Sequence, residues 1–381
     1  MRIGIIGAGS MGAGIAQVAA SSDCDVKIFD HSNDVCQLAL VKLDKILNRL
    51  IEKKRISSEK KSSILGNISI AKDLNAFKDC DLIIEAVIEN ESIKKDIFKK
   101  LDKIVSKHCI IASNTSSLSI TNLASSCSFS DRFIGIHFFN PAPLMPLVEI
   151  IPALQTDNLL VEKVYNLIEL WGKSPVIAKD TPGFIVNRIA RPFYGEALRI
   201  YEEGIADFAS IDQSMKKIGG FRMGPFELMD FIGNDVNYAV TKSVFKAFYY
   251  DPRYKPSFTQ RQYAEANWLG RKTNKGYYDY NQQDHSNDND VTDKKLSTEI
   301  FDRILVMLIN EAVDALYLRI ASENDIEIAM TKGVNYPKGL LQWGRDKTYS
   351  WCVEKLDSLY HIYHEDRYRC SPLLRTWAKT N

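Results

Sequence analysis

A histidine and a glutamate stand where this sequence could carry out proton transfer. His137 ends the apolar run 133–137, and Glu149 lies inside the apolar run 147–151. Ligands of open α/β sheets bind beyond the carboxyl ends of strands, so a strand-end histidine can face a substrate. A carboxylate in apolar surroundings needs a partner, and beside an imidazole it stabilises the charged ring. We expect His137 to act as a general base with Glu149 as its partner, as oxidation of an alcohol requires. A purely structural histidine is the alternative.

The segment Gly7–Gly12 has the glycine spacing of a dinucleotide-binding loop, G-x-G-x-x-G. It follows an apolar run at the start of the chain and opens a helical pattern, which is the context that gives this motif its meaning. Gly7 allows a tight turn, Gly9 lets the backbone approach a pyrophosphate, and Gly12 allows close packing of helix on strand. Free N–H groups at the helix start then face the phosphates.

Asp30 favours NAD over NADP as the dinucleotide. It follows the second apolar run, 23 residues after Gly7, where an acidic side chain accepts hydrogen bonds from the adenosine ribose. The next residues, His31-Ser32-Asn33, include no arginine that could hold a 2′-phosphate. FAD uses the same glycine pattern and stays an alternative, although no second flavin-binding segment is recognisable.

Short β-branched runs alternate with longer helical patterns up to about residue 180, which predicts βαβ units with a parallel sheet. The predicted strands are Ile3–Ile6, Val26–Phe29, Asp81–Val87, Ile110–Ser113 and Phe133–Phe138, and the predicted helices are Met11–Ser21 and Val35–Lys53. After Thr181-Pro182-Gly183 strand patterns almost vanish. Helices are predicted there over Asn187–Glu203, Ser210–Ile218 and Gly233–Tyr249. The fold class is therefore an α/β Rossmann domain followed by all-α helical domains.

The helical part contains an internal repeat at a spacing of 115 residues. Glu196-Ala197 recurs as Glu311-Ala312, and the same spacing relates Arg188 to Arg303, Ile205 to Ile320, Met215 to Met330, Phe221 to Tyr336 and Gly224 to Gly339. One ungapped register with this many matches predicts two copies of one helical domain. The copies differ at Asn187, which is replaced by Asp302 in the second copy.

These patterns divide the chain into four parts. We predict a Rossmann domain over residues 1–179, a helical domain over 180–280, a linker over 281–295 and a degenerate second copy of the helical domain over 296–381. The linker prediction depends on the run 281–290, which contains no apolar residue. A polar surface loop is the alternative for this run.

The overall composition excludes several classes of protein. The 381 residues carry 49 Lys+Arg against 48 Asp+Glu, which argues against binding to nucleic acid or an anionic membrane through overall charge. No run approaches the roughly 20 apolar residues of a membrane span, and the first residues do not resemble a signal peptide. Seven scattered cysteines without a C-x-x-C pair predict free thiols in a reducing cytoplasm, with no disulfide framework and no metal site.

Five spaced motifs together resemble the L-3-hydroxyacyl-CoA dehydrogenase family over about residues 1–280. They are Gly7–Gly12, Ser113–Ser117, His137–Pro141, Asp180–Arg188 and Met223–Leu228, in the family's order. The rest of the chain is similar to the long subgroup with a second, degenerate C-terminal domain, which includes 3-hydroxybutyryl-CoA and 3-hydroxyadipyl-CoA dehydrogenases. The resemblance implies NAD-dependent oxidation of an L-3-hydroxyacyl-CoA to the 3-ketoacyl-CoA, in fatty acid β-oxidation or in butanoate or phenylacetate breakdown.

The resemblance also implies a role for each matching residue. His137 would be the general base, Ser116 would bond the C3 oxygen of the substrate beside the nicotinamide, and Asn187 would complete the site from the helical domain. The positions that match cofactor contacts are Gly7, Gly9, Met11, Gly12, Asp30, Glu89, Lys94, Asn114, Ser116, Asn140 and Lys272. Asn187 could alternatively cap a helix, and Ser116 could be one of several loop hydroxyls.

The stretch 48–61 is rich in lysine and arginine and includes Lys53 and Lys54. The family places the phosphates of coenzyme A in this region, so both lysines are candidate substrate contacts. A solvated helix face is the alternative. As partners we expect the acyl-CoA substrate and either a homodimer or an intramolecular pseudo-dimer of the two copies, since short family members dimerise through the helical domain.

Two rival functions stay open from the sequence. One is a related dehydrogenase that acts on a free hydroxy acid, against which the basic stretch argues. The other is a non-catalytic NAD-binding protein on the same fold, because a fold does not fix a function.

Overall fold

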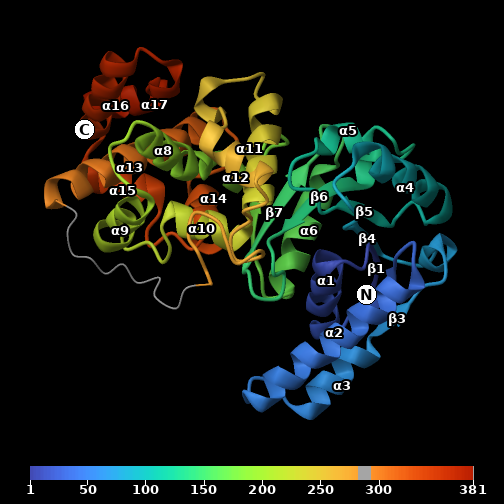
Figure 1. The fold of residues 1–381 in the computed structure, drawn as a ribbon. Coiled ribbons are helices and arrows are strands. Elements are labelled where there is room, and N and C mark those ends of the chain that lie inside the picture. Colours follow the sequence, from blue (N-terminus) through green and yellow to red (C-terminus); the bar gives the residue numbers. More distant parts are fainter. Residues whose placement is uncertain (282–292, 381) are drawn as a thin grey trace. The chain divides into compact units, whose positions relative to one another are not determined.

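The computed structural model describes residues 1–281 and 293–380 (Figure 1). The chain forms two compact units, Met1–Phe184 and Ile185–Asn381. The first unit ends a few residues beyond the predicted limit at residue 179, and the second contains both stretches that were predicted as separate helical domains. Most of the predicted linker, residues 282–292, lies outside the described residues. The domain limits therefore stay predictions.

An eight-stranded sheet forms the centre of the first unit, with the strand order β3-β2-β1-β4-β5-β6-β7-β8. The strands are β1 (Arg2–Ile6), β2 (Asp25–Phe29), β3 (Ile68–Ile70), β4 (Leu82–Glu85), β5 (Ile110–Ser113), β6 (Phe133–Phe138), β7 (Leu147–Pro152) and β8 (Ser174–Ile177). Every residue of β4, β5 and β6 is buried, as expected of strands covered on both faces. The sheet confirms the predicted Rossmann class of this unit.

The sheet departs from the predicted parallel arrangement at β7, a strand that was not predicted and that runs antiparallel to β6. Only residues 139–146 join these two strands, and a parallel crossover needs a dozen or more residues. The chain therefore has to turn back beside β6. The sequence also does not predict β3 and β8, because strands of three and four residues at the sheet edges are too short to show a pattern.

Six α-helices lie in the first unit. They are α1 (Ser10–Ser21), α2 (Asn33–Glu52), α3 (Ser58–Gly66), α4 (Glu91–Ile104), α5 (Ile120–Ala124) and α6 (Asn158–Leu170). α1 and α2 lie within two residues of the predicted helices. Cys36, Ala39, Leu43 and Leu47 are the buried residues of α2, at the spacing of an amphipathic helix. α2 and α3 run side by side away from the sheet (Figure 1).

The described part of the second unit contains helices and two isolated bridges but no strand, which confirms the predicted all-α class. The helices are α7 (Val186–Ile189), α8 (Arg191–Glu202), α9 (Phe208–Gly219), α10 (Pro225–Ile232), α11 (Asn234–Ala247), α12 (Phe258–Glu265), α13 (Lys294–Tyr317), α14 (Glu323–Ile328), α15 (Leu340–Lys347), α16 (Tyr349–Tyr363) and α17 (Pro372–Thr380). The single helix predicted over 187–203 is divided into α7 and α8. Pro192 lies in the first turn of α8, where its missing N–H and fixed φ favour a new helix start.

The helices of this unit recur at the spacing of the sequence repeat. α15 begins 115 residues after α10, and α16 begins 115 residues after α11. We call residues 185–280 the first segment and residues 293–380 the second segment. The long helix α13 of the second segment packs against α8 and α9 of the first. The two segments therefore share one core.

Candidate active site

The glycine loop between β1 and α1 has the geometry that its spacing predicts. Gly7 has φ of 101°, a conformation that L side chains rarely adopt. A Cβ on Gly12 would lie 1.8 Å from the carbonyl oxygen of Gly7, so only glycine fits there. A Cβ on Gly9 would meet no atom within 4 Å. The loop therefore packs tightly at its two ends and opens at its middle, as a pyrophosphate cradle requires.

Asp30 also makes a contact with the glycine loop that the sequence does not predict. It lies directly after β2, and its Oδ2 accepts a hydrogen bond of 2.8 Å from the backbone N–H of Ala8 in the glycine loop. Its Oδ1 lies 2.5 Å from Nδ1 of His31. The carboxylate therefore orders the loop at the same sheet edge where it would bind a ribose.

His137 and Glu149 face one another across the antiparallel pair of β6 and β7. They are direct register partners, and Nδ1 of His137 lies 2.7 Å from Oε2 of Glu149. His137 is 5% exposed and Glu149 is fully buried. The rings of Phe139 and Phe184 lie 4.5 and 6.0 Å from the imidazole, centroid to centroid. Because Nδ1 is held by the carboxylate, Nε2 is the nitrogen that can take a substrate proton.

The loop after β5 is joined to the end of β6. Oδ1 of Asn114 accepts a 2.8 Å hydrogen bond from the backbone N–H of Phe138, the residue after His137. The backbone N–H of Ser116 donates to Oε1 of Glu89 at 3.1 Å. Asn114 and Ser116 are therefore held by the two neighbouring strand ends, and the strand-end rule that singles out His137 also singles out this loop.

A buried ionic network at the end of β4 supports that loop, and the sequence predicts only part of it. Lys94 is 1% exposed, and its Nζ lies 2.6 Å from Glu85 and 3.3 Å from Glu89. Glu85, which was not predicted, also accepts hydrogen bonds from Ser113 Oγ at 2.7 Å and from a backbone N–H. Its position at the end of an apolar strand is the signal that could have found it.

The pKa values of the two glutamates shift in opposite directions. Burial raises the pKa of Glu85 above its usual value, although Lys94 opposes the shift. Burial also acts on Glu89, but Lys94 and the hydroxyls of Thr115 and Ser117 outweigh it and lower the pKa of this carboxyl. Glu89 is therefore kept as a carboxylate beside Ser116.

Asn187 and Lys272 are the predicted site residues of the second unit. Asn187 lies inside α7, whose N-cap residue is Ile185, so helix capping does not explain the asparagine. Its backbone oxygen accepts a 3.1 Å hydrogen bond from Nε of Arg191. Lys272 follows α12 and forms an ion pair of 2.8 Å with Asp235.

The other predicted contacts of the first unit are Met11, Asn140, Lys53 and Lys54. Met11 is half-buried in the first turn of α1, and Asn140 is exposed two residues after the end of β6. Lys53 and Lys54 are exposed at the turn between α2 and α3. Lys54 has φ of 55°. The basic stretch 48–61 therefore covers the end of α2, a turn and the start of α3.

Three further features of the described residues concern metal ligands, thiols and membrane crossing. The described histidine, cysteine and acidic side chains include no group that could hold a metal ion. All seven cysteines are free and buried. None of the helices in 1–281 and 293–380 has the length and apolar character that crossing a membrane requires.

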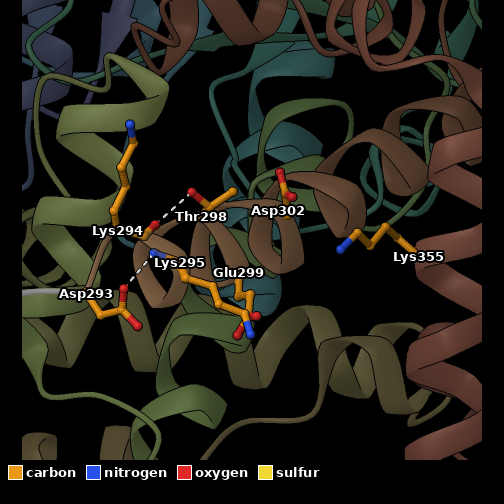
Figure 2. A pocket seen from close by; sticks show the side chains of 7 residues that line it. All are labelled: Asp293, Lys294, Lys295, Thr298, Glu299, Asp302 and Lys355. Carbon is orange, nitrogen blue, oxygen red and sulfur yellow. Dashed lines mark hydrogen bonds between the residues drawn. The ribbon is translucent and has the colours of Figure 1, made fainter.

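A separate hollow of about 600 Å³ lies on the second segment (Figure 2). Its lining is Asp293, Lys294, Lys295, Thr298, Glu299, Asp302 and Lys355. Asp302, the counterpart of Asn187, forms an ion pair of 2.8 Å with Lys347. Since none of the predicted site residues line this hollow and Asp302 is neutralised by Lys347, it does not reproduce the site of the first segment.

Comparison with known proteins gives the family of the chain. The family model for the NAD-binding domain of 3-hydroxyacyl-CoA dehydrogenase matches residues 2–181, and the model for the C-terminal domain matches residues 183–280 and 300–381. The 3-hydroxyadipyl-CoA dehydrogenase of Escherichia coli K12 is 34% identical over 99% of this chain and 97% of its own length. The chain therefore belongs to the 3-hydroxyacyl-CoA dehydrogenase family, and its first unit contains the family's NAD-binding domain.

Two further relatives differ in how much of the chain they cover. The crystal structure of 3-hydroxybutyryl-CoA dehydrogenase from Escherichia coli K12 has a TM-score of 0.94 at 33% identity and covers 100% of this chain and 98% of its own. The 3-hydroxybutyryl-CoA dehydrogenase of Clostridioides difficile is 42% identical and covers 74% of this chain and 100% of its own. The family thus includes proteins similar to the whole chain and shorter ones similar to about three quarters of it.

Proposed function

We propose that this protein oxidises the C3 hydroxyl of an L-3-hydroxyacyl-CoA to the 3-ketoacyl-CoA, with NAD as hydride acceptor. The observation that carries the proposal is the buried pair of His137 and Glu149, 2.7 Å apart at the carboxyl end of β6. An imidazole held in this way has one nitrogen committed to the carboxylate and one left for a substrate proton. Family membership supplies the substrate class.

The glycine loop and the neighbouring strand ends fit NAD. The open space above Gly9 leaves room for a pyrophosphate, and the N-terminus of α1 presents free N–H groups to it. Asp30 follows β2, where it would accept hydrogen bonds from the adenosine ribose. We propose Gly7, Met11, Gly12, Glu89, Lys94, Asn114, Ser116, Asn140 and Lys272 as further cofactor contacts. NAD, when bound, supplies the hydride acceptor.

The remaining chemistry is assigned to side chains of the chain itself. Nε2 of His137 takes the proton of the C3 hydroxyl, and Glu149 stabilises the imidazolium that forms. Ser116 and Asn187 donate hydrogen bonds to the C3 oxygen and hold it in position. Lys53 and Lys54, exposed at the turn after α2, are proposed to contact the phosphates of coenzyme A.

Replacement of the proposed base tests the function. We expect His137→Gln to lower kcat for an L-3-hydroxyacyl-CoA by ~10²–10⁴, the range for loss of a positioned acid–base group. The affinity for NAD, measured by fluorescence titration, should barely change. Near-normal turnover of the variant would contradict the role of His137, and failure of the wild-type protein to oxidise any acyl-CoA of a four- to sixteen-carbon panel would contradict the substrate class.

We also propose that the second segment is a degenerate copy of the first and takes the place of a partner subunit within one chain. Two buried ionic clusters support this proposal. Glu311 of the second segment lies 2.6 Å from Arg188, and Glu196 of the first segment lies 3.1 Å from Arg303. The two glutamates and the two arginines are each related by the 115-residue spacing. The contacts are therefore reciprocal, as in an interface between two equal partners.

Removal of the second segment tests the pseudo-dimer. A chain that ends near residue 283 should associate into a dimer in light scattering or bind a dye specific for apolar surface, because α8 and α9 lose the cover of α13. An unchanged oligomeric state without new apolar surface would contradict the proposal.

We propose domain limits near residues 179 and 280 on the same basis. The seven free thiols support a reducing location such as the cytoplasm.

A further inference from the structure

Arg191, at the start of α8, is a buried arginine with unusual surroundings. It is 7% exposed. Its Nε donates to the backbone oxygen of Asn187 at 3.1 Å, and its Nη1 donates to Oγ1 of Thr241 at 3.2 Å. Its guanidinium carbon lies 4.8 Å from the centre of the Tyr194 ring. Each of these partners is uncharged.

The other buried arginines of the described chain all contact a carboxylate. Arg132 lies 2.7 Å from Asp102, Arg188 lies 2.6 Å from Glu311, and Arg367 lies 3.1 Å from Glu196. Arg191 has no ion pair in the described part of the chain, and burial lowers its pKa, opposed only by tyrosine hydroxyls. A buried charge without an opposite charge is costly, and an anionic ligand would supply the missing partner.

Polar atoms around Arg191 also lack partners. Nε2 of Gln260 donates to Asn237 at 2.6 Å and to Thr241 at 3.1 Å. The amide nitrogen of Asn237 and the amide oxygen of Gln260 are nevertheless fully buried without a hydrogen-bond partner, and so is the hydroxyl of Tyr336. Buried polar groups are almost always paired, so this cluster of unsatisfied atoms marks a place built for something besides packing.

The second segment shows that the fold does not need these polar residues. At the 115-residue spacing, Arg191 corresponds to Val306, Asn237 to Cys352 and Thr241 to Leu356. All three counterparts are buried, and they lie in helices that correspond to α8 and α11. The same arrangement of helices therefore packs with an apolar interior. Packing of the helices therefore does not explain the polar cluster of the first segment.

We propose that Arg191 binds the terminal carboxylate of a dicarboxylic 3-hydroxyacyl-CoA and thereby sets a preference for this substrate class. The inference rests on the proposed function, in which Asn187 contacts the C3 oxygen. Asn187 in α7 and Arg191 at the start of α8 lie four residues apart across the junction of the two helices, and Nε of Arg191 donates a hydrogen bond to the backbone oxygen of Asn187. In a six-carbon chain the carboxylate carbon is three bonds from C3. A guanidinium can receive a carboxylate through two parallel hydrogen bonds.

A matched pair of six-carbon substrates tests this preference. We expect wild-type kcat/KM for 3-hydroxyadipyl-CoA to exceed that for 3-hydroxyhexanoyl-CoA, which lacks only the carboxylate. Arg191→Met should lower kcat/KM for the dicarboxylic substrate about 10- to 150-fold, the range for a charged hydrogen bond, and leave the value for the other substrate nearly unchanged. Arg222→Met, which alters an exposed arginine of the same unit, is the matched control and should change neither value.

Milder variants keep the test decisive if Arg191→Met does not fold. Arg191→Lys keeps the charge but loses the paired geometry, and Thr241→Val removes one partner of the guanidinium. Both should reduce the ratio of the two kcat/KM values. Equal loss on both substrates would show that Arg191 only positions Asn187 and would overturn the proposal, as would a wild-type protein without the preference. Inactivity of the wild-type protein toward both substrates overturns the proposed function, and this inference with it.

Discussion

The first and second segments of the helical unit keep the same structural contacts and differ in their chemistry. In the first, Asp212 accepts hydrogen bonds from the backbone N–H groups of Phe226 and Glu227, at the start of α10. In the second, Glu327 accepts one from Leu341, at the start of α15. Both acids precede their helix by the same spacing. A carboxylate at a helix start satisfies free N–H groups and complements the helix dipole.

The residues proposed to meet the substrate do not recur in this way. Asn187 is replaced by Asp302, which forms an ion pair with Lys347, and Arg191 is replaced by Val306. The comparison teaches that contacts needed for folding are present in both segments, whereas side chains proposed for binding and catalysis are present in one. Differences between the segments therefore identify candidate functional residues without any comparison to another protein.

The largest effect is expected on the free energy of unfolding, when one of the reciprocal ionic clusters is broken. Glu311→Gln removes the charge that faces Arg188 at 2.6 Å and Arg253 at 3.3 Å. Loss of a buried charge partner should lower the free energy of unfolding by about 3–5 kcal/mol. Glu196→Gln, which acts on Arg303 and Arg367, should have a similar effect. Urea unfolding measures both, and a large loss in one variant with none in the other would break the equivalence of the segments.

Exchanging the residue types of Asn187 and its counterpart Asp302 is expected to affect activity in the first segment but not in the second. Asn187→Asp makes the first segment resemble the second and should lower kcat/KM about 10²–10³-fold, as for loss of one oxygen-binding donor. Asp302→Asn is the reverse exchange and should leave kcat within about twofold. Steady-state kinetics with one acyl-CoA distinguish the two. Equal losses in both variants would mean that the segments are not functionally distinct.

A smaller effect on stability is expected when pH changes the protonation of the capping acids, Asp212 at the start of α10 and Glu327 at the start of α15. Burial raises the pKa of Asp212 to about 7, from the usual 3.8 of an aspartate. Between these values the folded state holds more protons than the unfolded state, so the stability contributed by this group falls as pH rises. Relative to Asp212→Asn, the wild-type free energy of unfolding should fall by about 3 kcal/mol from pH 5 to pH 8.

The capping acid of the second segment gives the matched measurement. Burial raises the pKa of Glu327 as well, so the comparison with Glu327→Gln should show a fall in the same direction. Urea unfolding at several pH values measures both differences. A wild-type advantage that grows with pH in either case would contradict the shared role of these acids.

Local patterns made much of the fold predictable. Ile110–Ser113 and Phe133–Phe138 are strands with the predicted limits, because short β-branched runs between turns carry their own signal. The presence of β3, β7 and β8 and the antiparallel direction of β7 were missed, because pairing partners decide these features. In the site, His137 was predictable from its strand end, whereas Glu85 and Lys94 form their contact only once β4 and α4 are in place.

By itself, the sequence determined the glycine loop, the strand-end histidine and the 115-residue repeat, because each depends on the spacing of nearby or recurring residues. Only the tertiary structure decided which charges find partners. The register of β6 and β7 pairs His137 with Glu149, and the packing of α13 pairs Arg188 with Glu311 but leaves Arg191 among uncharged groups. The physical reason is that burial and charge pairing depend on residues far apart in the chain, which no local pattern contains.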